Sequence, residues 1–390
     1  MQIKKIVVGL IILLVLLSGC APEKTIIPAV DWQDEFPEQY NSYLLNSETE
    51  STLYGGSVPI NYLEKYPYLR DFYDGYGFSI EYLRARGHTY ALEDVMNTER
   101  PKAGASCLAC KSADFVVLLK EDGISVNSLN FEDVAKPEMN TISCYDCHEN
   151  TPGTFVVTRE HLNTGLSFSD KDYNPKELAC AQCHVEYYMD PETKEVILPW
   201  QNGQDTDAMI QYYDGIGYSD WTHPTTGTEL LKVQHPEFET YQGGIHAKMG
   251  LTCVDCHMPN TENEKGESYN SHHWTSPLKT IESSCLTCHS NETPESLRST
   301  VEGIQASVDT KMADVSSVLV ELINELSQAT TDGSIDEDVL NIARDYHRKA
   351  QYKWDFVFVE NGEGFHNENL AHKNLDEAFE LALKGLEVLE

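Results

Sequence analysis

The chain has 390 residues and is strongly acidic, with 63 Asp and Glu against 28 Lys and Arg and a formal net charge of −35. A protein with this charge does not attract nucleic acid or an anionic membrane surface through its overall field. If the substrate is an anion, its binding site must therefore supply its own positive charge.

The first 20 residues have the features of an export signal. Two lysines precede an apolar run, 6–17, which is too short to span a membrane, and small residues lead into Cys20. This pattern resembles a bacterial lipobox and predicts a lipoprotein signal peptide over 1–19 with lipidation of Cys20. An ordinary cleaved signal with a chance cysteine is the alternative. Both predict an exported protein, periplasmic or on the extracytoplasmic face, and the lipobox also predicts a lipid anchor.

The rest of the chain divides into three stretches by composition. Residues 20–50 are polar and predict an extended N-terminal tether. Residues 51–390 predict a single domain, with a body over about 51–293 and long C-terminal helices over about 294–390. The body is rich in Gly, Pro and Asn and has no long hydrophobic periodicity, which predicts short elements and loops.

Ten of the eleven cysteines form five C-x-x-C units. The units are CLACK (107–111), CYDCH (144–148), CAQCH (180–184), CVDCH (253–257) and CLTCH (285–289). In a C-x-x-C-H unit, two thiols attach a haem covalently and the His binds its iron. The predicted attachment residues are Cys107, Cys110, Cys144, Cys147, Cys180, Cys183, Cys253, Cys256, Cys285 and Cys288. The predicted proximal ligands are Lys111, His148, His184, His257 and His289.

Zinc binding and disulfide bonding are the alternatives for these cysteines. The gaps between successive units are 33, 32, 69 and 28 residues, whereas zinc ribbons keep roughly 15–20 residues between their halves. Zinc also gives no reason for a His after four of the five pairs, and identical short-spaced pairs are untypical of a disulfide framework. Five covalent c-type haems explain the pattern better. The unit with Lys111 differs from the other four, so its iron is the candidate reaction centre.

The C-terminal region has a helical pattern. From about residue 294, apolar residues recur at spacings of three or four, and 330–333 interrupts the pattern. Ser334 is a candidate cap for a second helix that runs to about Val359, and a last helix is expected over 368–389. The apolar stripe of the first helix predicts either intramolecular core or a subunit interface. The expected fold class is thus all-α, mainly helices with long loops around a haem-packed core.

Together these motifs resemble a known family. C-x-x-C-K followed by four C-x-x-C-H units, with RGHTYALEDVMNTER (86–100), CHVEYY (183–188), LKVQHPEFE (231–239) and GFHN (364–367), is similar to the cytochrome c nitrite reductases. These are ammonia-forming, pentahaem enzymes, and the resemblance covers the chain after the signal peptide. It implies a second axial His for each C-x-x-C-H haem. His88 is implied for CAQCH, His246 for CLTCH, His272 for CYDCH and His366 for CVDCH. His273 is the rival of His272.

The resemblance also implies the reactive face of the Lys111 haem and a calcium site. Arg100, Tyr187 and His235 are implied on the open face, where a fixed cation and proton donors suit an oxyanion substrate. The implied calcium ligands are the side chains of Glu186 and Gln234 and the backbone carbonyls of Tyr187 and Lys232, and such oxygen donors suit Ca²⁺.

The predicted function is therefore six-electron reduction of nitrite to ammonium, with four bis-His haems relaying electrons. A multihaem electron-transfer cytochrome, or a related reductase acting on hydroxylamine or a sulfur oxyanion, is the alternative. The implied partners are nitrite, an electron donor and a second copy of the chain. The donor is either a membrane-anchored multihaem quinol dehydrogenase or a soluble multihaem cytochrome.

Overall fold

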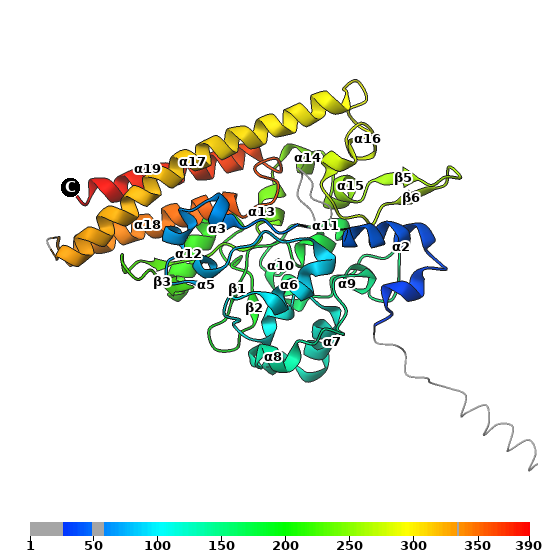
Figure 1. The fold of residues 1–390 in the computed structure, drawn as a ribbon, viewed down its shortest axis with the longest axis horizontal. Helices are drawn as coiled ribbons and strands as arrows, with labels where there is room; N and C mark the ends of the chain where they lie inside the picture. Colours follow the sequence, from blue (N-terminus) through cyan, green and yellow to red (C-terminus); the bar gives the residue numbers. More distant parts are fainter. Residues whose placement is uncertain (1–25, 49–57, 334) are drawn as a thin grey trace, which may run out of the picture.

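The computed structural model describes residues 26–48, 58–333 and 335–390 (Figure 1). These residues form a mainly helical protein, which confirms the predicted fold class. The signal peptide and Cys20 lie outside the described residues. Within the described ranges, no helix is both long and apolar enough to cross a membrane.

The N-terminal and central elements are short, as the Gly- and Pro-rich composition predicts. The 3₁₀ helices are η1 (Ala29–Trp32), η2 (Leu45–Ser47), η3 (His88–Tyr90), η4 (Ala105–Leu108), η5 (Ile124–Ser128) and η6 (Pro277–Lys279). The short α-helices are α2 (Pro37–Leu44), α3 (Tyr62–Lys65), α4 (Leu69–Phe72), α5 (Gly77–Ile80), α6 (Ala91–Asn97), α7 (Ala113–Asp122), α8 (Phe131–Val134), α9 (Cys144–His148), α10 (Glu160–Leu166), α11 (Pro175–Ala181), α12 (Thr206–Ile216), α13 (Glu237–Tyr241), α14 (Ile245–Lys248), α15 (Cys253–His257) and α16 (Ile281–Ser284).

The strands of the described residues form three antiparallel two-stranded sheets. They are β1 (Tyr188–Met189) with β2 (Val196–Ile197), β3 (Trp221–Thr222) with β4 (Glu229–Leu230), and β5 (Asn260–Glu262) with β6 (Ser268–Asn270). They are too small to form a sheet core.

Three long helices complete the chain and lie along one side of the molecule (Figure 1). They are α17 (Pro294–Asp332), α18 (Glu337–Phe358) and α19 (Glu368–Glu387). The apolar stripe of α17 is buried within the chain, since Val315, Leu319 and Leu322 are each 0% exposed. The described chain itself therefore covers this stripe.

The boundaries of these helices follow local chemistry. Pro294 stands in the first turn of α17, and the left-handed Gly333 (φ 61°) ends the helix where a break is predicted. The predicted cap, Ser334, lies outside the described residues. The N-cap of α18 is Asp336, whose side chain accepts the Asp338 N–H at 2.9 Å.

The predicted extended tether is wrong for residues 29–47, which form η1, α2 and η2 and pack against the body. The side-chain amide of Asn46 donates to the His272 carbonyl at 2.7 Å and accepts the Trp274 N–H at 2.9 Å. Ser42 Oγ accepts the His272 N–H at 3.0 Å. These polar residues form hydrogen bonds with an irregular backbone segment more than 200 residues away, and no hydrophobic periodicity marks that role.

Aromatic packing joins the body to the long helices. Phe72 of α4 and Trp354 of α18 meet edge to face, with ring centroids 4.8 Å apart. Their cluster also contains Leu319 and Leu322 of α17. The long helices therefore form a rigid support for the loops that carry the predicted site.

Candidate active site

Two of the C-x-x-C-H motifs are single helical turns held by their own aspartates. CYDCH forms α9 and CVDCH forms α15. In each turn the aspartate before the second cysteine, Asp146 or Asp255, accepts the N-cap backbone N–H at 2.7 Å and completes a capping box. A helical turn places residues three apart on one face, so both thiols of each motif point to the same side.

The motif cysteines and the predicted ligands surround one cavity of about 2560 Å³. None of the ten motif cysteines forms a disulfide. The cavity lining contains all ten, together with every predicted axial and distal residue: Lys111, His148, His184, His257, His289, His88, His246, His272, His366, Arg100, Tyr187 and His235. The fold therefore brings together residues that lie up to 278 positions apart in the sequence.

The histidines of the cavity face one another in pairs. Their ring centroids are separated by 5.8 Å for His88 and His184, 6.4 Å for His148 and His272, 6.4 Å for His246 and His289, and 6.2 Å for His257 and His366. Two imidazoles bound to opposite faces of one iron would have centroids about 6 Å apart, because each metal–nitrogen bond is about 2 Å. Together with the thiol pairs, these ring pairs fit covalently attached haem.

Backbone carbonyls orient three of these rings. The Nδ1 atoms of His148, His257 and His272 lie 2.8, 3.1 and 3.0 Å from carbonyl oxygens. A bond at Nδ1 sets the tautomer and leaves Nε2 for a metal. His272, which precedes His273 in the chain, is the member of that pair that faces His148.

Two carboxylates lie beside two further rings, and the sequence analysis missed both. Glu237 Oε2 lies 3.4 Å from His184 Nδ1, and Glu360 Oε1 contacts His366 Nδ1. Both acids are buried, with 8% and 2% exposure. A possible signal is their place in apolar strings, HPEFE and FVFVE, where a solvent-facing acid is unexpected.

Two glycines allow the loops that carry predicted axial ligands to pack closely against neighbouring parts of the chain. Gly364 has a φ of 92°, and a Cβ there would lie 2.5 Å from Val308 of α17. A Cβ on Gly244 would lie 2.3 Å from the His366 carbonyl oxygen. The loops that carry His246 and His366 therefore lie in close contact with each other and with the long helix.

Arg100, Tyr187 and His235 line the same cavity as the CLACK motif. The Arg100 guanidinium carbon lies 4.2 Å from the centroid of the Phe78 ring, and Tyr187 packs in the apolar cluster that contains Cys107 and Cys110. Burial lowers the pKa of His235 to about 3 against the opposing effect of Glu237. Nδ1 of His235 is buried and, among the described residues, has no hydrogen-bond partner.

His235 is also near a predicted axial ligand. Its ring centroid is 6.3 Å from that of His184, while His88 lies 5.8 Å from His184 on the same measure. Ring spacing alone therefore does not select between His88 and His235 as the partner of His184.

The predicted calcium ligands converge on a buried carboxylate. Glu186 is 0% exposed and accepts the Gln234 N–H at 2.6 Å, and the Gln234 side-chain amide lies 3.1 Å from the Lys232 carbonyl oxygen. Burial raises the pKa of Glu186 well above its usual value, and Glu239 and Asp220 increase this shift. A divalent cation would compensate this buried negative charge.

Within the described ranges, no group of three or more His, Cys, Asp or Glu side chains could hold a metal ion.

A buried ion pair fixes the loop that contains Lys232 and His235. Lys232 Nζ lies 2.9 Å from Asp355 Oδ2 of α18, and the two side chains are 1% and 0% exposed. The same carboxylate accepts the Val233 N–H at 2.9 Å and the Tyr73 hydroxyl at 2.6 Å. The long helix thereby positions the backbone that leads to His235.

Known proteins match this chain over most of its length. The model of the cytochrome c552 family matches residues 29–389. The chain is 36% identical to cytochrome c nitrite reductase subunit NrfA of Nitratidesulfovibrio vulgaris, over 92% of its own length and 77% of the relative's. It is 32% identical to cytochrome c-552 of Parabacteroides distasonis, over 92% and 76%.

A solved structure is similar over almost the whole chain. It is the catalytic subunit NrfA of cytochrome c nitrite reductase from Desulfovibrio desulfuricans, described with two calcium sites. It matches with a TM-score of 0.87 and 30% identity, covering 95% of this chain and 87% of that one. From the family match, these identities and this fold, the protein is a member of the cytochrome c552 family.

Proposed function

We propose that the protein is an ammonia-forming nitrite reductase, which reduces nitrite to ammonium with six electrons at the haem of the CLACK motif. The observation that carries the proposal is an asymmetry within one cavity. Each C-x-x-C-H histidine faces another imidazole, whereas the CLACK motif offers Lys111 and shares its cavity with Arg100, Tyr187 and His235. Paired imidazoles suit electron transfer, and an iron with one open face suits substrate reduction.

The haem supplies the redox chemistry, and the surrounding side chains bind the anion and donate protons. Arg100 is charged at all relevant pH values and forms two-pronged hydrogen bonds with oxyanions. His235 has a buried Nδ1 that no described residue engages, so the ring is available to a substrate oxygen or a proton relay. Tyr187 adds a hydroxyl donor beside them. These groups supply the local positive charge and donors that a protein of net charge −35 requires for an anionic substrate.

Four His pairs would hold the haems that relay electrons to this site. His148, His184, His257 and His289 would be the proximal ligands, and His272, His88, His366 and His246, respectively, would be their second ligands. The ring distances of 5.8–6.4 Å and the hydrogen bonds at Nδ1 support this assignment.

A calcium ion binds beside the active site and holds its loops. Its ligands are the Glu186 and Gln234 side chains and the Tyr187 and Lys232 carbonyls. The buried charge of Glu186 and the contact between Gln234 and the Lys232 carbonyl support this site. Because Tyr187 and His235 adjoin ligands, the ion orders the residues that contact substrate.

Two measurements test the proposed function. The intact mass of the mature protein should exceed the peptide mass by five haems, and the protein should form ammonium from nitrite when reduced viologen supplies electrons. A protein that carries five haems but does not turn over nitrite would be an electron-transfer cytochrome. Faster turnover of hydroxylamine or sulfite than of nitrite would favour the related reductases.

The protein is exported, with 1–19 as its signal peptide, and is lipid-anchored through Cys20. The domain comprises the predicted 51–390 together with 29–47, which packs against it, a second copy associates through the long helices, and a multihaem quinol dehydrogenase or soluble multihaem cytochrome donates the electrons. Mass analysis of the mature N-terminus tests the anchor. Size-exclusion chromatography with light scattering tests the homodimer.

A further inference from the structure

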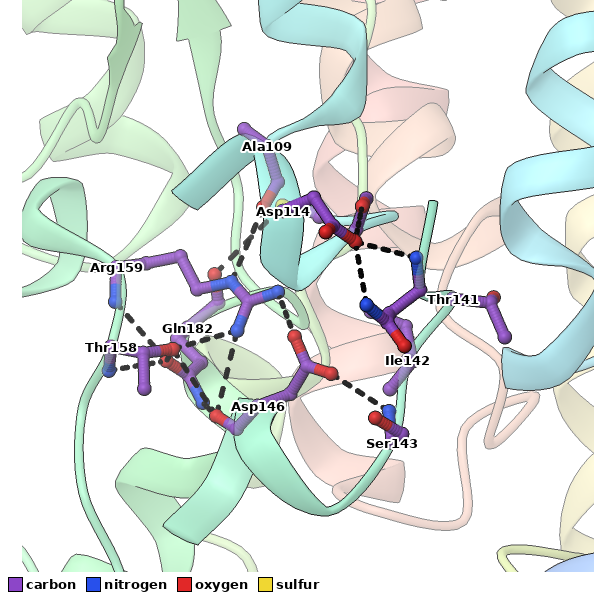
Figure 2. A network of polar contacts seen from close by, with 12 residues as sticks. Ala109, Asp114, Thr141, Ile142, Ser143, Asp146, Thr158, Arg159 and Gln182 are labelled. Carbon is purple, nitrogen blue, oxygen red and sulfur yellow. Dashed lines mark hydrogen bonds and ion pairs between the residues drawn. The ribbon is translucent and has the colours of Figure 1, made fainter. Parts of the chain in front are cut away.

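A buried polar network joins three of the five haem-attachment motifs (Figure 2). At its centre is Arg159, which is 2% exposed and directly precedes α10. Arg159 Nε donates to the Ala109 carbonyl at 3.2 Å, Nη1 donates to Thr158 Oγ1 at 2.7 Å, and Nη2 pairs with Asp146 Oδ1. Ala109 belongs to CLACK and Asp146 to CYDCH, so one side chain connects the motif of the proposed reaction centre to an electron-transfer motif.

The third motif enters through Gln182 of CAQCH. Its side-chain oxygen accepts the Thr158 N–H at 2.9 Å and the Arg159 N–H at 3.3 Å, and its Nε2 donates to the Asp146 carbonyl at 2.7 Å. Ala109, Asp146 and Gln182 each stand directly before the second cysteine of their motif. The network therefore contacts the same motif position, directly before the second cysteine, in three attachment loops.

The charges of this network are buried and oriented. The side chains of Arg159 and Asp146 are 2% and 3% exposed, so solvent screens them little. The carboxylate belongs to the CYDCH loop, while the guanidinium reaches beyond it to the CLACK carbonyl (Figure 2). The guanidinium thus lies between the two motifs, with Nε toward the CLACK carbonyl and Nη1 3.5 Å from the Asp146 carbonyl, whereas the carboxylate lies on the CYDCH side. Stability alone does not explain the pair, because burying two charges often costs as much as their attraction returns.

We propose that Arg159 is a positioning residue that locks the three loops together, and that the oriented Arg159–Asp146 pair raises the reduction potential of the CLACK haem relative to the CYDCH haem. A nearby cation favours the reduced iron and a nearby anion favours the oxidised iron. The pair therefore biases electrons toward the site of substrate reduction. This inference rests on the haem assignments of the proposed function.

The test is a redox titration of the full five-haem protein as wild type, Arg159→Met, Asp146→Asn and the double variant. The open-faced haem reports CLACK, and the low-spin signal altered in His272→Met identifies CYDCH. Arg159→Met should lower the CLACK potential and Asp146→Asn should raise the CYDCH potential. The equilibrium constant for electron transfer from CYDCH to CLACK should fall in all three variants, by roughly tenfold for Arg159→Met. Opposite shifts in the two single variants are not expected from loosened packing.

The chain offers a matched control in an exposed ion pair between the same two segments. Lys120 follows CLACK on α7, and its Nζ lies 2.8 Å from Oε1 of Glu149, the residue after CYDCH, with side-chain exposures of 49% and 41%. Lys120→Met removes one positive charge, as Arg159→Met does, but at a screened position. It should change the equilibrium constant less than about threefold.

The inference is overturned if Arg159→Met shifts the potentials no more than Lys120→Met, or if the two single variants shift them in the same direction. If Arg159→Met loads fewer than five haems by intact mass, the CYDCH potential of the Asp146→Asn variant becomes the deciding measurement. A raised CYDCH potential then supports the inference, and an unchanged one overturns it.

Wild-type protein that loads five haems and reduces nitrite, but fails this test, would leave the proposed function intact. Wild-type protein without five haems would overturn the proposed function itself.

Discussion

The long helices and the haem-binding body are stabilised in different ways. In α17, α18 and α19, apolar side chains at helical spacing cover one another, and Leu319 is 0% exposed. In the body the elements are short, and buried polar groups such as Arg159 and Glu186 lie among them. The long helices therefore rely on apolar packing, which they share with part of the body, whereas the short elements rely more on buried polar contacts.

The two regions meet at the loops that carry the proposed site residues. Asp355 of α18 anchors Lys232, and Gly364 allows the loop that carries His366 to lie on α17. The comparison predicts that changes in the cavity affect turnover, changes in the helices affect stability, and changes at this contact affect both.

The largest expected effect is on turnover in the His235→Asn variant. Losing a positioned proton-transfer group should lower nitrite turnover by about 10²–10⁴-fold, while urea unfolding stays close to that of wild type. Single-turnover and steady-state assays measure the first effect, and circular dichroism measures the second.

The low-spin haem signals provide the control for this variant. They should all remain in His235→Asn, whereas His88→Asn should lose one. Loss of a low-spin signal in His235→Asn would make His235, which lies 6.3 Å from His184 by ring centroids, an axial ligand and contradict its proposed role.

Breaking the Lys232–Asp355 pair, which joins the two regions, should lower both stability and nitrite turnover. Lys232→Met leaves the Asp355 carboxylate buried without its cation and should reduce the free energy of unfolding by about 3–5 kcal/mol. Nitrite turnover should fall as well, because the Val233 backbone leads to His235. The matched control is Lys349→Met, which breaks an exposed pair with Asp345 on the same helix and should cost less than about 1 kcal/mol.

The double variant Lys232→Met/Asp355→Leu should recover only part of the lost stability, because no unpaired charge remains but the Val233 N–H and the Tyr73 hydroxyl lose their acceptor. If Lys232→Met unfolds no more easily than Lys349→Met, the pair does not join the two regions energetically.

Within the long helices, Leu319→Ala should reduce stability without changing the chemistry. A cavity in this packing should cost about 2–5 kcal/mol, measured as a lower urea midpoint. The haem potentials and nitrite turnover of the folded protein should stay the same. Ile342→Ala, at an α18 position that is 50% exposed, is the control and should be near neutral. A shifted haem potential in Leu319→Ala would show that the two regions are not separable.

The sequence was informative wherever a local rule decides the structure. Pro294 and Gly333 mark the ends of α17 because they act on their own backbone, and the C-x-x-C units identify attachment sites because the chemistry needs only adjacent residues. The helical segment 29–47 was not predicted, since its contacts with 272–274 arise only after folding.

The site residues also divide into those that a local motif identifies and those that depend on contacts between distant segments. Cysteines and proximal ligands follow from the motifs, whereas the distal histidines were implied only by family resemblance. The acids Glu237 and Glu360 and the network around Arg159 were missed, because their partners lie in other loops. Buried charges whose partners lie far away in the sequence are paired only after folding. In a single sequence, the one sign of them is an acidic residue within an apolar stretch.

The smallest expected effect tests the calcium site, where order in the body depends on an ion. The Lys232 carbonyl and the Gln234 side chain precede His235, so losing the ion should loosen the loop without releasing a covalent haem. Chelation by EGTA, or Glu186→Gln, should lower nitrite turnover by about tenfold, while intact mass still shows five haems.

Added calcium separates the two treatments. It should restore the chelated wild type but not Glu186→Gln, because the variant lacks the fully buried carboxylate that balances the ion's charge. Glu192→Gln, at an exposed acid, is the control and should respond to chelation as wild type does. Unchanged turnover after chelation, with no calcium detected by metal analysis, would contradict the site. Glu186 would then be a protonated core acid, in keeping with its raised pKa, and the Asp355 contact alone would hold the His235 loop.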